Sequence, residues 1–290
     1  MTAQQKACRF YVKLILLVVM AMTTLSLAGC TIKFFYQQLD WLVPWYIDKQ
    51  LDLNAAQEKR LRAQVAQQLT WHRSTQVPLY INTLKSWQIF SAGPFSRQEF
   101  DRLSTETQRH FSQLSAHVLP DFKELMFTLD ARQRKALYAV IEKSNKEYEK
   151  KYLGLGVKLD KVRLEETQEA VDFWLGSISK EQDKRIQRLL SDYKSTEPES
   201  MINRRNWLTQ FRRILESDAS SAQIKSRQMD ALFFSPQDHW SQDYKNRFDA
   251  NAELSVVMVE QVLSLVSSKQ REHLIKRFKG WELEFRDIQR

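Results

Sequence analysis

The sequence predicts an all-α protein, an elongated bundle of many helices built from two diverged copies of one helical unit. Three observations lead to this prediction. Gly and Pro together supply only 12 of the 290 residues, and no convincing run of alternating or β-branched strand sequence occurs. Apolar residues recur at spacings of three and four, as at Leu61, Val65 and Leu69. A short phrase typical of helix starts occurs four times.

The expected helices follow from this periodicity and from the breaks between periodic runs. They are 34–48 (interrupted at Pro44), 55–73, 78–91, 97–118, 120–128, 131–151, 159–176, 180–193, 198–216, 222–233, 237–265 and 268–287. Leu153 to Gly156 is the interior stretch that reads as flexible. A body of this size can bury a substantial core without a metal or a disulfide.

The repeated phrase has an apolar residue, then Asn, Asp or Ser, then Gln three residues later. The cap and glutamine positions are Asn54 and Gln57, Asp130 and Gln133, Ser179 and Gln182, and Ser267 and Gln270. This spacing predicts a capping box, in which the cap side chain accepts from a first-turn amide and Gln reaches back to the amide of the cap residue. Four ordinary capped helices would account for the pattern. The shared Gln is harder to explain, because Glu also caps and complements the helix dipole better.

A second repeat supports a duplication. Arg73-Ser74-Thr75-Gln76-Val77-Pro78 is echoed by Lys194-Ser195-Thr196-Glu197-Pro198. We therefore predict a first helical unit at 50–152 and a second at 175–290, with a connecting loop and helix at 153–174. The aromatic segment 30–49 would stand outside the duplication.

The N-terminus has the features of an export signal. A positive start (Lys6, Arg9, Lys13) precedes an apolar run from Leu14 to Leu27 that is too short to favour a membrane-spanning helix. The run ends in Leu27-Ala28-Gly29-Cys30, which resembles the lipobox of bacterial lipoproteins. The resemblance implies a signal peptide over 1–29, cleavage after Gly29 and lipid on Cys30, with membrane attachment through that lipid. An uncleaved anchor helix is the alternative.

Thr31 follows the cysteine, whereas Asp at this place is the inner-membrane retention signal of enterobacterial lipoproteins. We therefore expect the outer membrane, with the body facing the periplasm. The mature chain of 261 residues has no cysteine free for a disulfide, since Cys8 leaves with the signal and Cys30 carries lipid. Removal of 1–29 lowers the formal net charge from +9 to +6. At that location a basic surface favours acidic lipids, glycans or unfolded chains over nucleic acid, although an evenly solvated surface is the commoner explanation.

Two resemblances concern the mature chain. The stretch Tyr36 to Tyr46, with its Asp-Trp-Leu-Val-Pro-Trp-Tyr motif, and Trp71-His72-Arg73 resemble a family of Gram-negative lipoproteins of unknown function. The capping phrases resemble, more remotely, the Leu-Thr-x-x-Gln motifs of the Spy and CpxP periplasmic proteins. That second resemblance implies thin, curved helical dimers, and in Spy an ATP-independent chaperone. No copy here has Thr at the second position of the motif.

The sequence does not predict an enzyme. It has no His-Glu-x-x-His, no Gly-x-Ser-x-Gly and no Gly-rich phosphate loop, so we expect no catalytic residue, metal or cofactor. His110 and His117 could share a helix face, but packing is the commoner role for such residues. An enzyme with an unrecognised site is the third functional hypothesis.

His72 and Arg73 are the first candidate binding residues. We predict that they close the 55–73 helix before a turn, where a cation would interact favourably with the carbonyl end of the dipole. The echo at Asp192 to Lys194 keeps an aromatic residue and a cation but loses the histidine, which favours a structural joint over a binding role.

Two further stretches admit both explanations. The candidate binding residues Arg204, Arg205, Trp207, Arg212 and Arg213 form the densest cationic and aromatic stretch of the mature chain. They could bind acidic or unfolded chains, or they could form a solvated helix face beside a buried stripe. The aromatic rings of 34–46 could lie at a membrane interface, but Asp40, Asp48 and Asp52 lead us to expect that they pack on the helical body.

The leading functional hypothesis is a periplasm-facing outer-membrane lipoprotein that acts by binding, with Spy-like chaperone or envelope-stress work. The alternative is an envelope scaffold or adaptor that binds a protein, peptidoglycan or lipid partner.

Overall fold

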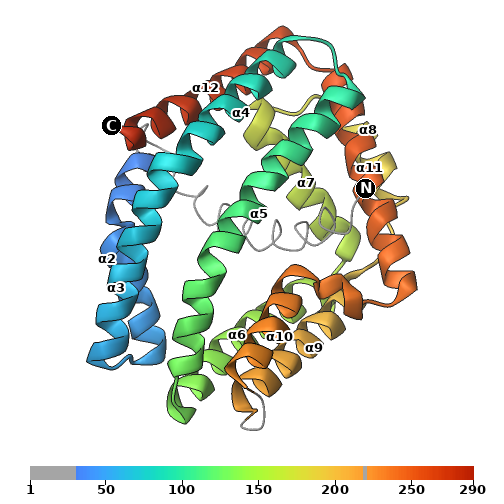
Figure 1. The fold of residues 1–290 in the computed structure, drawn as a ribbon. Helices are drawn as coiled ribbons and strands as arrows, with labels where there is room; N and C mark the ends of the chain where they lie inside the picture. Colours follow the sequence, from blue (N-terminus) through green and yellow to red (C-terminus); the bar gives the residue numbers. More distant parts are fainter. Residues whose placement is uncertain (1–30, 218–220) are drawn as a thin grey trace.

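The computed structural model describes residues 31–217 and 221–290, and every regular element in these ranges is a helix (Figure 1). The prediction of an all-α multi-helix bundle is confirmed for this part of the chain. Within it, no helix combines the length and the apolar character needed to cross a membrane. The expected signal peptide and Cys30 lie outside the described residues.

The α-helices are α2 (Thr31–Leu51), α3 (Ala55–Trp71), α4 (Val77–Ala92), α5 (Arg97–Thr128), α6 (Ala131–Leu153), α7 (Leu159–Leu175), α8 (Lys180–Leu190), α9 (Glu197–Glu216), α10 (Ala222–Phe234), α11 (Gln242–Ser264) and α12 (Ser268–Gln289). A π-helical turn, η1 (His72–Gln76), joins α3 to α4, and a 3₁₀ turn, η2 (Pro236–His239), precedes α11. The expected boundaries agree with these to within a few residues, apart from three places.

Two of the differences concern proline. The sequence predicts a break before Pro120, but α5 continues through it, and α2 likewise continues through Pro44. A proline inside a helix removes one backbone hydrogen bond. Leu119 and Leu125 are buried on either side of Pro120, so packing holds α5 on both sides of the proline.

The third difference lies at 237–265, which was expected to be one helix. The chain forms η2 and then restarts at α11, because Ser241 accepts a hydrogen bond from the Tyr244 amide and caps the new helix. The buried Trp240 lies between the two elements.

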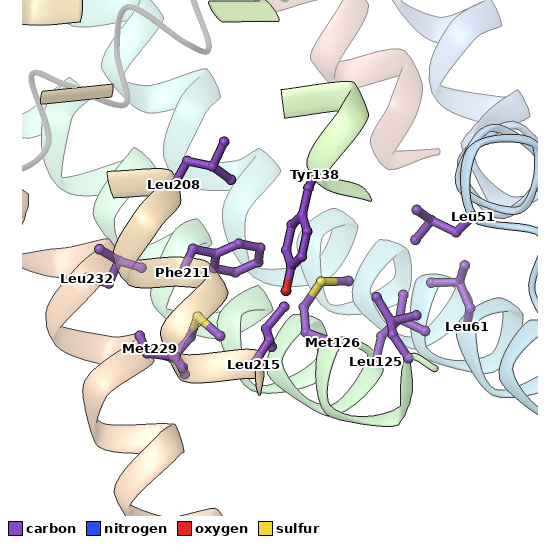
Figure 2. Packing of buried hydrophobic residues seen from close by; sticks show 12 residues of the cluster. Leu51, Leu61, Leu125, Met126, Tyr138, Leu208, Phe211, Leu215, Met229 and Leu232 are labelled. Atoms are coloured by element: carbon purple, nitrogen blue, oxygen red, sulfur yellow. The ribbon is translucent and has the colours of Figure 1, made fainter. Parts of the chain in front are cut away.

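The largest core joins the end of α2 with α3, α5, α6, α9 and α10 (Figure 2). Phe211, which is 1% exposed, stacks on Trp207 with ring centroids 5.0 Å apart. The other buried members are Leu51, Leu61, Leu125, Met126, Leu129, Tyr138, Leu208, Ile214, Leu215, Met229 and Leu232. This core therefore combines residues from both predicted units.

A second core joins α4, α7, α8, α11 and α12 through Leu84, Leu175, Ile186, Val262, Leu274 and Phe278. A third, smaller core joins α2, α4 and α12 through Tyr36, Val77, Ile81 and Ile288. Among the described residues, these buried positions all lie between Tyr36 and Ile288. The chain from residue 31 onward thus carries a core of its own.

Two pairs of helices join the two predicted units. α12 of the second lies along α4 of the first, and α6 of the first lies against α9 of the second (Figure 1). A buried polar residue marks each contact: Glu282 accepts from Gln88 Nε2 at 2.9 Å, and Asn145 accepts from Arg204 Nε at 2.9 Å.

Asn145 and Glu282 occupy the same place in their helices, fifteen residues after the cap residues of α6 and α12. Burial opposes the charge of Glu282, but hydrogen bonds from Gln88, Lys279 and Arg286 outweigh it and lower the pKa of this carboxyl to about 2. Each contact thus includes one buried polar residue that is hydrogen-bonded to the facing helix.

Candidate functional site

The four capping boxes predicted from the sequence are present. Asn54, Asp130, Ser179 and Ser267 each accept from the amide of the glutamine three residues on, and that glutamine accepts from the amide of the cap residue. The apolar residue before each cap and the glutamine after it therefore mark true helix starts.

The structure also shows why the third helical residue is Gln. Gln57 and Gln133 are buried and face each other, with Gln57 Nε2 donating to Gln133 Oε1 at 3.1 Å and Gln133 Nε2 donating back to Gln57 Oε1 at 2.8 Å. Each Nε2 also donates to a backbone carbonyl just before the opposite helix, from Gln57 to Thr128 at the end of α5 and from Gln133 to Asp52. Both hydrogens and the oxygen of each side-chain amide are thus engaged.

Gln182 and Gln270 repeat this arrangement at the starts of α8 and α12. Gln270 Nε2 donates to Gln182 Oε1 at 2.8 Å, and Gln182 Nε2 lies 3.4 Å from Gln270 Oε1. Their amides also donate to the carbonyls of Val262 and Ser177. A carboxylate could also cap either helix, but it has no hydrogen to donate to these backbone carbonyls. Two facing carboxylates would also repel each other. The glutamines were identified as caps from the sequence, but their pairing was missed.

The stretch from Trp71 to Pro78 does not form the expected turn. The chain stays helical from Ala55 to Ala92, with the π-helical turn η1 at His72–Gln76, so the prediction of a helix end here is wrong. The Val77 amide donates to the His72 carbonyl, five residues back. Hydroxyls of Ser74 and Thr75 donate to the carbonyls of Thr70 and Trp71. A π-helical turn lets the helix pass Pro78 with its carbonyls satisfied.

The echo of this stretch behaves differently. α8 ends at Leu190 and α9 begins at Glu197, so the intervening residues form a true turn. The first copy has one more residue between the Ser-Thr pair and proline than the second. A single extra residue is what a π-helical turn accommodates.

His72 lies in a cluster of aromatic and polar side chains. Its Nδ1 is 3.1 Å from the Tyr36 hydroxyl, which also donates to the Leu69 carbonyl. Its ring also packs edge-on against Tyr80, with centroids 5.4 Å apart. The Arg73 guanidinium lies 5.7 Å from the centroid of the Tyr36 ring. His72 and Arg73 therefore help hold α2 against the α3–α4 junction, as a structural joint would.

The two histidines of α5 are not a pair. His110 is buried, and its Nε2 lies 2.8 Å from Thr83 Oγ1. His117 is exposed and stacks on Trp71, with ring centroids 3.6 Å apart. Across the described residues, no group of three or more His, Cys, Asp or Glu side chains could hold a metal ion.

The basic stretch of α9 forms an interface with α6. Arg204 contacts Asn145 and lies over the Tyr148 ring, Arg205 pairs with Glu149, and Arg212 pairs with Glu142. Trp207 joins the largest core, and Arg213 is exposed. These contacts favour the structural explanation of this stretch.

The expectation for the aromatic segment is partly wrong. Tyr36 packs on the body, but Phe34, Trp41, Trp45 and Tyr46 are 58, 48, 46 and 54% exposed. Only one face of α2 is turned toward α3 and α12, so a helix with rings on several faces leaves some of them outside.

In the described part of the chain, the best-formed hollows are too small for a ligand larger than water. The two hollows have volumes of about 10 and 20 Å³, close to the room that one water needs. The larger is lined in part by Asn203, Trp207, His239 and Trp240.

These features define a helical protein organised by two buried glutamine pairs. Most of the candidate binding residues that the sequence had indicated form contacts between helices. The chain belongs to a family of unknown function, DUF6279, which matches residues 49–245. The match includes Trp71-His72-Arg73 and three of the four capping glutamines. Comparison with curated proteins and with solved structures found no significant match.

The glutamine pairing predicts that exchanging Gln and Glu changes stability at a paired capping position more than at an unpaired one. Gln133→Glu keeps the cap but removes the donor to Asp52 and places a carboxylate against Gln57, so we expect a loss of about 1–3 kcal/mol in unfolding free energy at pH 7. Urea denaturation measures this loss. Glu99→Gln is the matched control, because Glu99 holds the same position in α5 and its side chain is 41% exposed; we expect a change within about 0.5 kcal/mol. Equal effects of the two substitutions would contradict the pairing argument.

His72 predicts a pH dependence of stability. Burial lowers the pKa of His72, so the folded state binds a proton less readily than the unfolded chain, whose pKa is near 6.5. This contribution to stability is present above pH 6.5 and is lost as the pH falls from there toward the lowered folded pKa. We therefore expect His72→Phe to show a smaller decrease of Tm between pH 7.5 and 5.5 than the parent chain. The exposed His239→Phe variant should keep the parent's decrease.

Proposed function

We propose that this protein is an outer-membrane lipoprotein that faces the periplasm, is held by lipid on Cys30, and acts by binding unfolded envelope proteins without ATP. The anchor rests on the Leu27-Ala28-Gly29-Cys30 motif after a short apolar run. The binding role rests on the helical body. The hollows described above have room for about one water molecule, and many side chains of the described residues face solvent, so we place binding on the outer surface.

The two helix pairs that join the predicted units carry the chaperone proposal. If the chain is a duplication, then α4 with α12 and α9 with α6 are the same contact made twice, once in each direction. The Gln57–Gln133 and Gln182–Gln270 pairs are likewise equivalent. This reciprocity is what two exchanged subunits fused into one chain would produce, and it supports kinship with the helical dimers of the Spy and CpxP proteins. The step from that architecture to activity is an analogy of fold.

The same comparison extends the proposed repeat at its start. α2 and α7 both end at a buried leucine, Leu51 and Leu175, followed by a residue with left-handed backbone. Those residues are Asp52, with φ 52°, and Gly176, with φ 73°. The next helix-start phrase follows within three residues in each case. The proposed units therefore run from α2 to α6 and from α7 to α12, so that α2 no longer stands outside the duplication.

Client binding would use exposed apolar residues on a basic surface. Ile89, Ile202 and Leu283 are 76, 54 and 49% exposed. The mature chain carries a formal charge of +6. Positive charge would steer acidic segments of a client, while scattered apolar contacts would hold them weakly.

The alternative is an envelope scaffold or adaptor. The exposed rings of α2 favour it, because four large aromatic residues on one helix form a more specific contact surface than scattered isoleucines do.

An aggregation assay separates the two proposals. We expect the chain lacking residues 1–30 to suppress light scattering by a chemically unfolded client at near-stoichiometric ratios, and Ile89→Ser with Ile202→Ser to weaken the suppression. Serum albumin at equal mass is the control. Absence of suppression, together with capture of one specific envelope partner, would favour the scaffold.

The lipid anchor has its own test. Cys30→Ala should abolish incorporation of labelled palmitate in cells, whereas Cys8→Ala should leave it unchanged, because Cys8 lies in the cleaved signal. Labelling that persists in Cys30→Ala would contradict the anchor.

A further inference from the structure

Three exposed rings of α2 lie in a line, and we call Phe34, Trp41 and Trp45 the aromatic row. Their spacings of seven and eleven residues are close to two and three turns of an α-helix, so they share one face. The three rings are 58, 48 and 46% exposed. Isolated exposed apolar residues are ordinary, but three large rings along one helix face form a contact surface.

The row is held in place by the rest of α2. Ile32, Tyr36 and Leu39 on the other side of the helix pack in the third core, and the Ile32 amide donates to Glu284 of α12 at 2.7 Å. Within the row, the ring centroids of Trp41 and Trp45 are 6.4 Å apart. The rings are therefore presented on a fixed helix.

Polar groups surround the row as they would at a water–lipid boundary. Trp41 Nε1 donates to Gln38 Oε1 at 2.6 Å, and the Lys49 ammonium lies 5.1 Å from the centroid of the Trp45 ring. Tryptophan is favoured at membrane interfaces because its ring enters the apolar boundary while its N–H stays among polar groups. Lysine beside such rings would meet lipid phosphates.

The aromatic row lies close to Cys30 in the sequence, and this position indicates which partner surface covers it. Cys30 is bonded directly to Thr31, the first residue of α2, so no linker separates the expected lipid from the helix. Phe34 follows Thr31 by three residues, about 4.5 Å along the helix. Acyl chains on Cys30 would therefore hold the start of the row at the bilayer surface. The occupant that this geometry favours is the bilayer itself.

The acidic residues that had argued against a membrane contact are engaged elsewhere. Asp48 accepts from the Leu53 amide at 2.9 Å, and Asp52 pairs with Arg132 at 2.5 Å. Asp40 is exposed but lies about a third of a turn from the row, and it accepts from the Trp41 amide. Asp48 lies on the same face as the row, three residues after Trp45, and its carboxylate is engaged by the Leu53 amide; Gln37, Gln38 and Lys49 also border the row.

We propose that the aromatic row of α2 lies in the headgroup region of the membrane that holds the Cys30 lipid, and so docks the helical body against the bilayer. This proposal rests on the lipid anchor of the proposed function, but it concerns a separate surface. A lipid alone would leave the body free to pivot about one point, whereas a row of rings beside it defines which face meets the membrane.

Site-specific quenching tests this proposal in the lipidated chain. Once Cys8 is removed and Cys30 is acylated, Gln37→Cys supplies one thiol beside the row for a fluorescent label, and Ile89→Cys supplies one on α4. In phosphatidylethanolamine–phosphatidylglycerol vesicles, we expect aqueous iodide to quench the label at 37 several-fold less than the label at 89. Adding Trp41→Ser and Trp45→Ser should remove this protection, with an unchanged circular dichroism spectrum. Equal quenching at the two positions would overturn the proposal.

A second arm does not depend on the anchor. The chain from residue 31, without lipid, should co-sediment with the same vesicles, and Trp41→Ser with Trp45→Ser should weaken this binding about tenfold or more. Leu155→Ser with Ile224→Ser, at exposed apolar residues outside α2, should leave it unchanged. If Cys30 proves unlipidated, this arm alone decides the proposal, and binding that ignores the row refutes it. Protection of the label at 37 that needs no vesicles and rises with protein concentration would assign the row to a second copy of the chain.

Discussion

The two buried glutamine pairs are the contacts on which the rest of the architecture depends. Each pair joins the starts of two helices that are distant in sequence, and each glutamine also donates to a backbone carbonyl in the segment before the opposite helix. Because every polar atom of the side-chain amides is engaged, displacement of one helix would leave several buried groups without partners. The pairs thus set the positions from which α3, α6, α8 and α12 extend, and those helices supply much of the two larger cores.

From these fixed starts, the helices cross between the predicted halves. α6 reaches α9 and α12 reaches α4, and each crossing buries one polar residue at an equivalent position, Asn145 or Glu282. A polar residue in an apolar seam costs desolvation unless its partner is in register, so such a residue favours one alignment of the two helices. Both larger cores therefore combine residues of the two predicted halves.

α2 connects this body to the N-terminus. Its inner face is held by the third core and by the Tyr36–His72 contact at the π-helical turn, and its outer face carries the aromatic row. The sequence indicated His72 as a candidate binding residue. In the corresponding stretch of the second copy, Arg163 of α7 lies over the Tyr193 ring and pairs with Glu197, so that contact is made without a histidine.

The sequence by itself determined the helical class, most helix boundaries and all four capping boxes, because these depend on side-chain periodicity and on contacts within four residues. Tertiary structure decided what local patterns do not encode. Pro120 and Pro78 were expected to interrupt helices, but packing on both sides keeps α5 continuous, and a π-helical turn carries α3 into α4. The pairing of the glutamines, the α6 partners of Arg204 and Arg212, and the outward turn of Trp41 and Trp45 all depend on residues 50 or more positions away, or on which face of a helix the body covers. Local sequence specifies where a helix starts, whereas the fold of the whole chain determines which face of that helix packs against another helix.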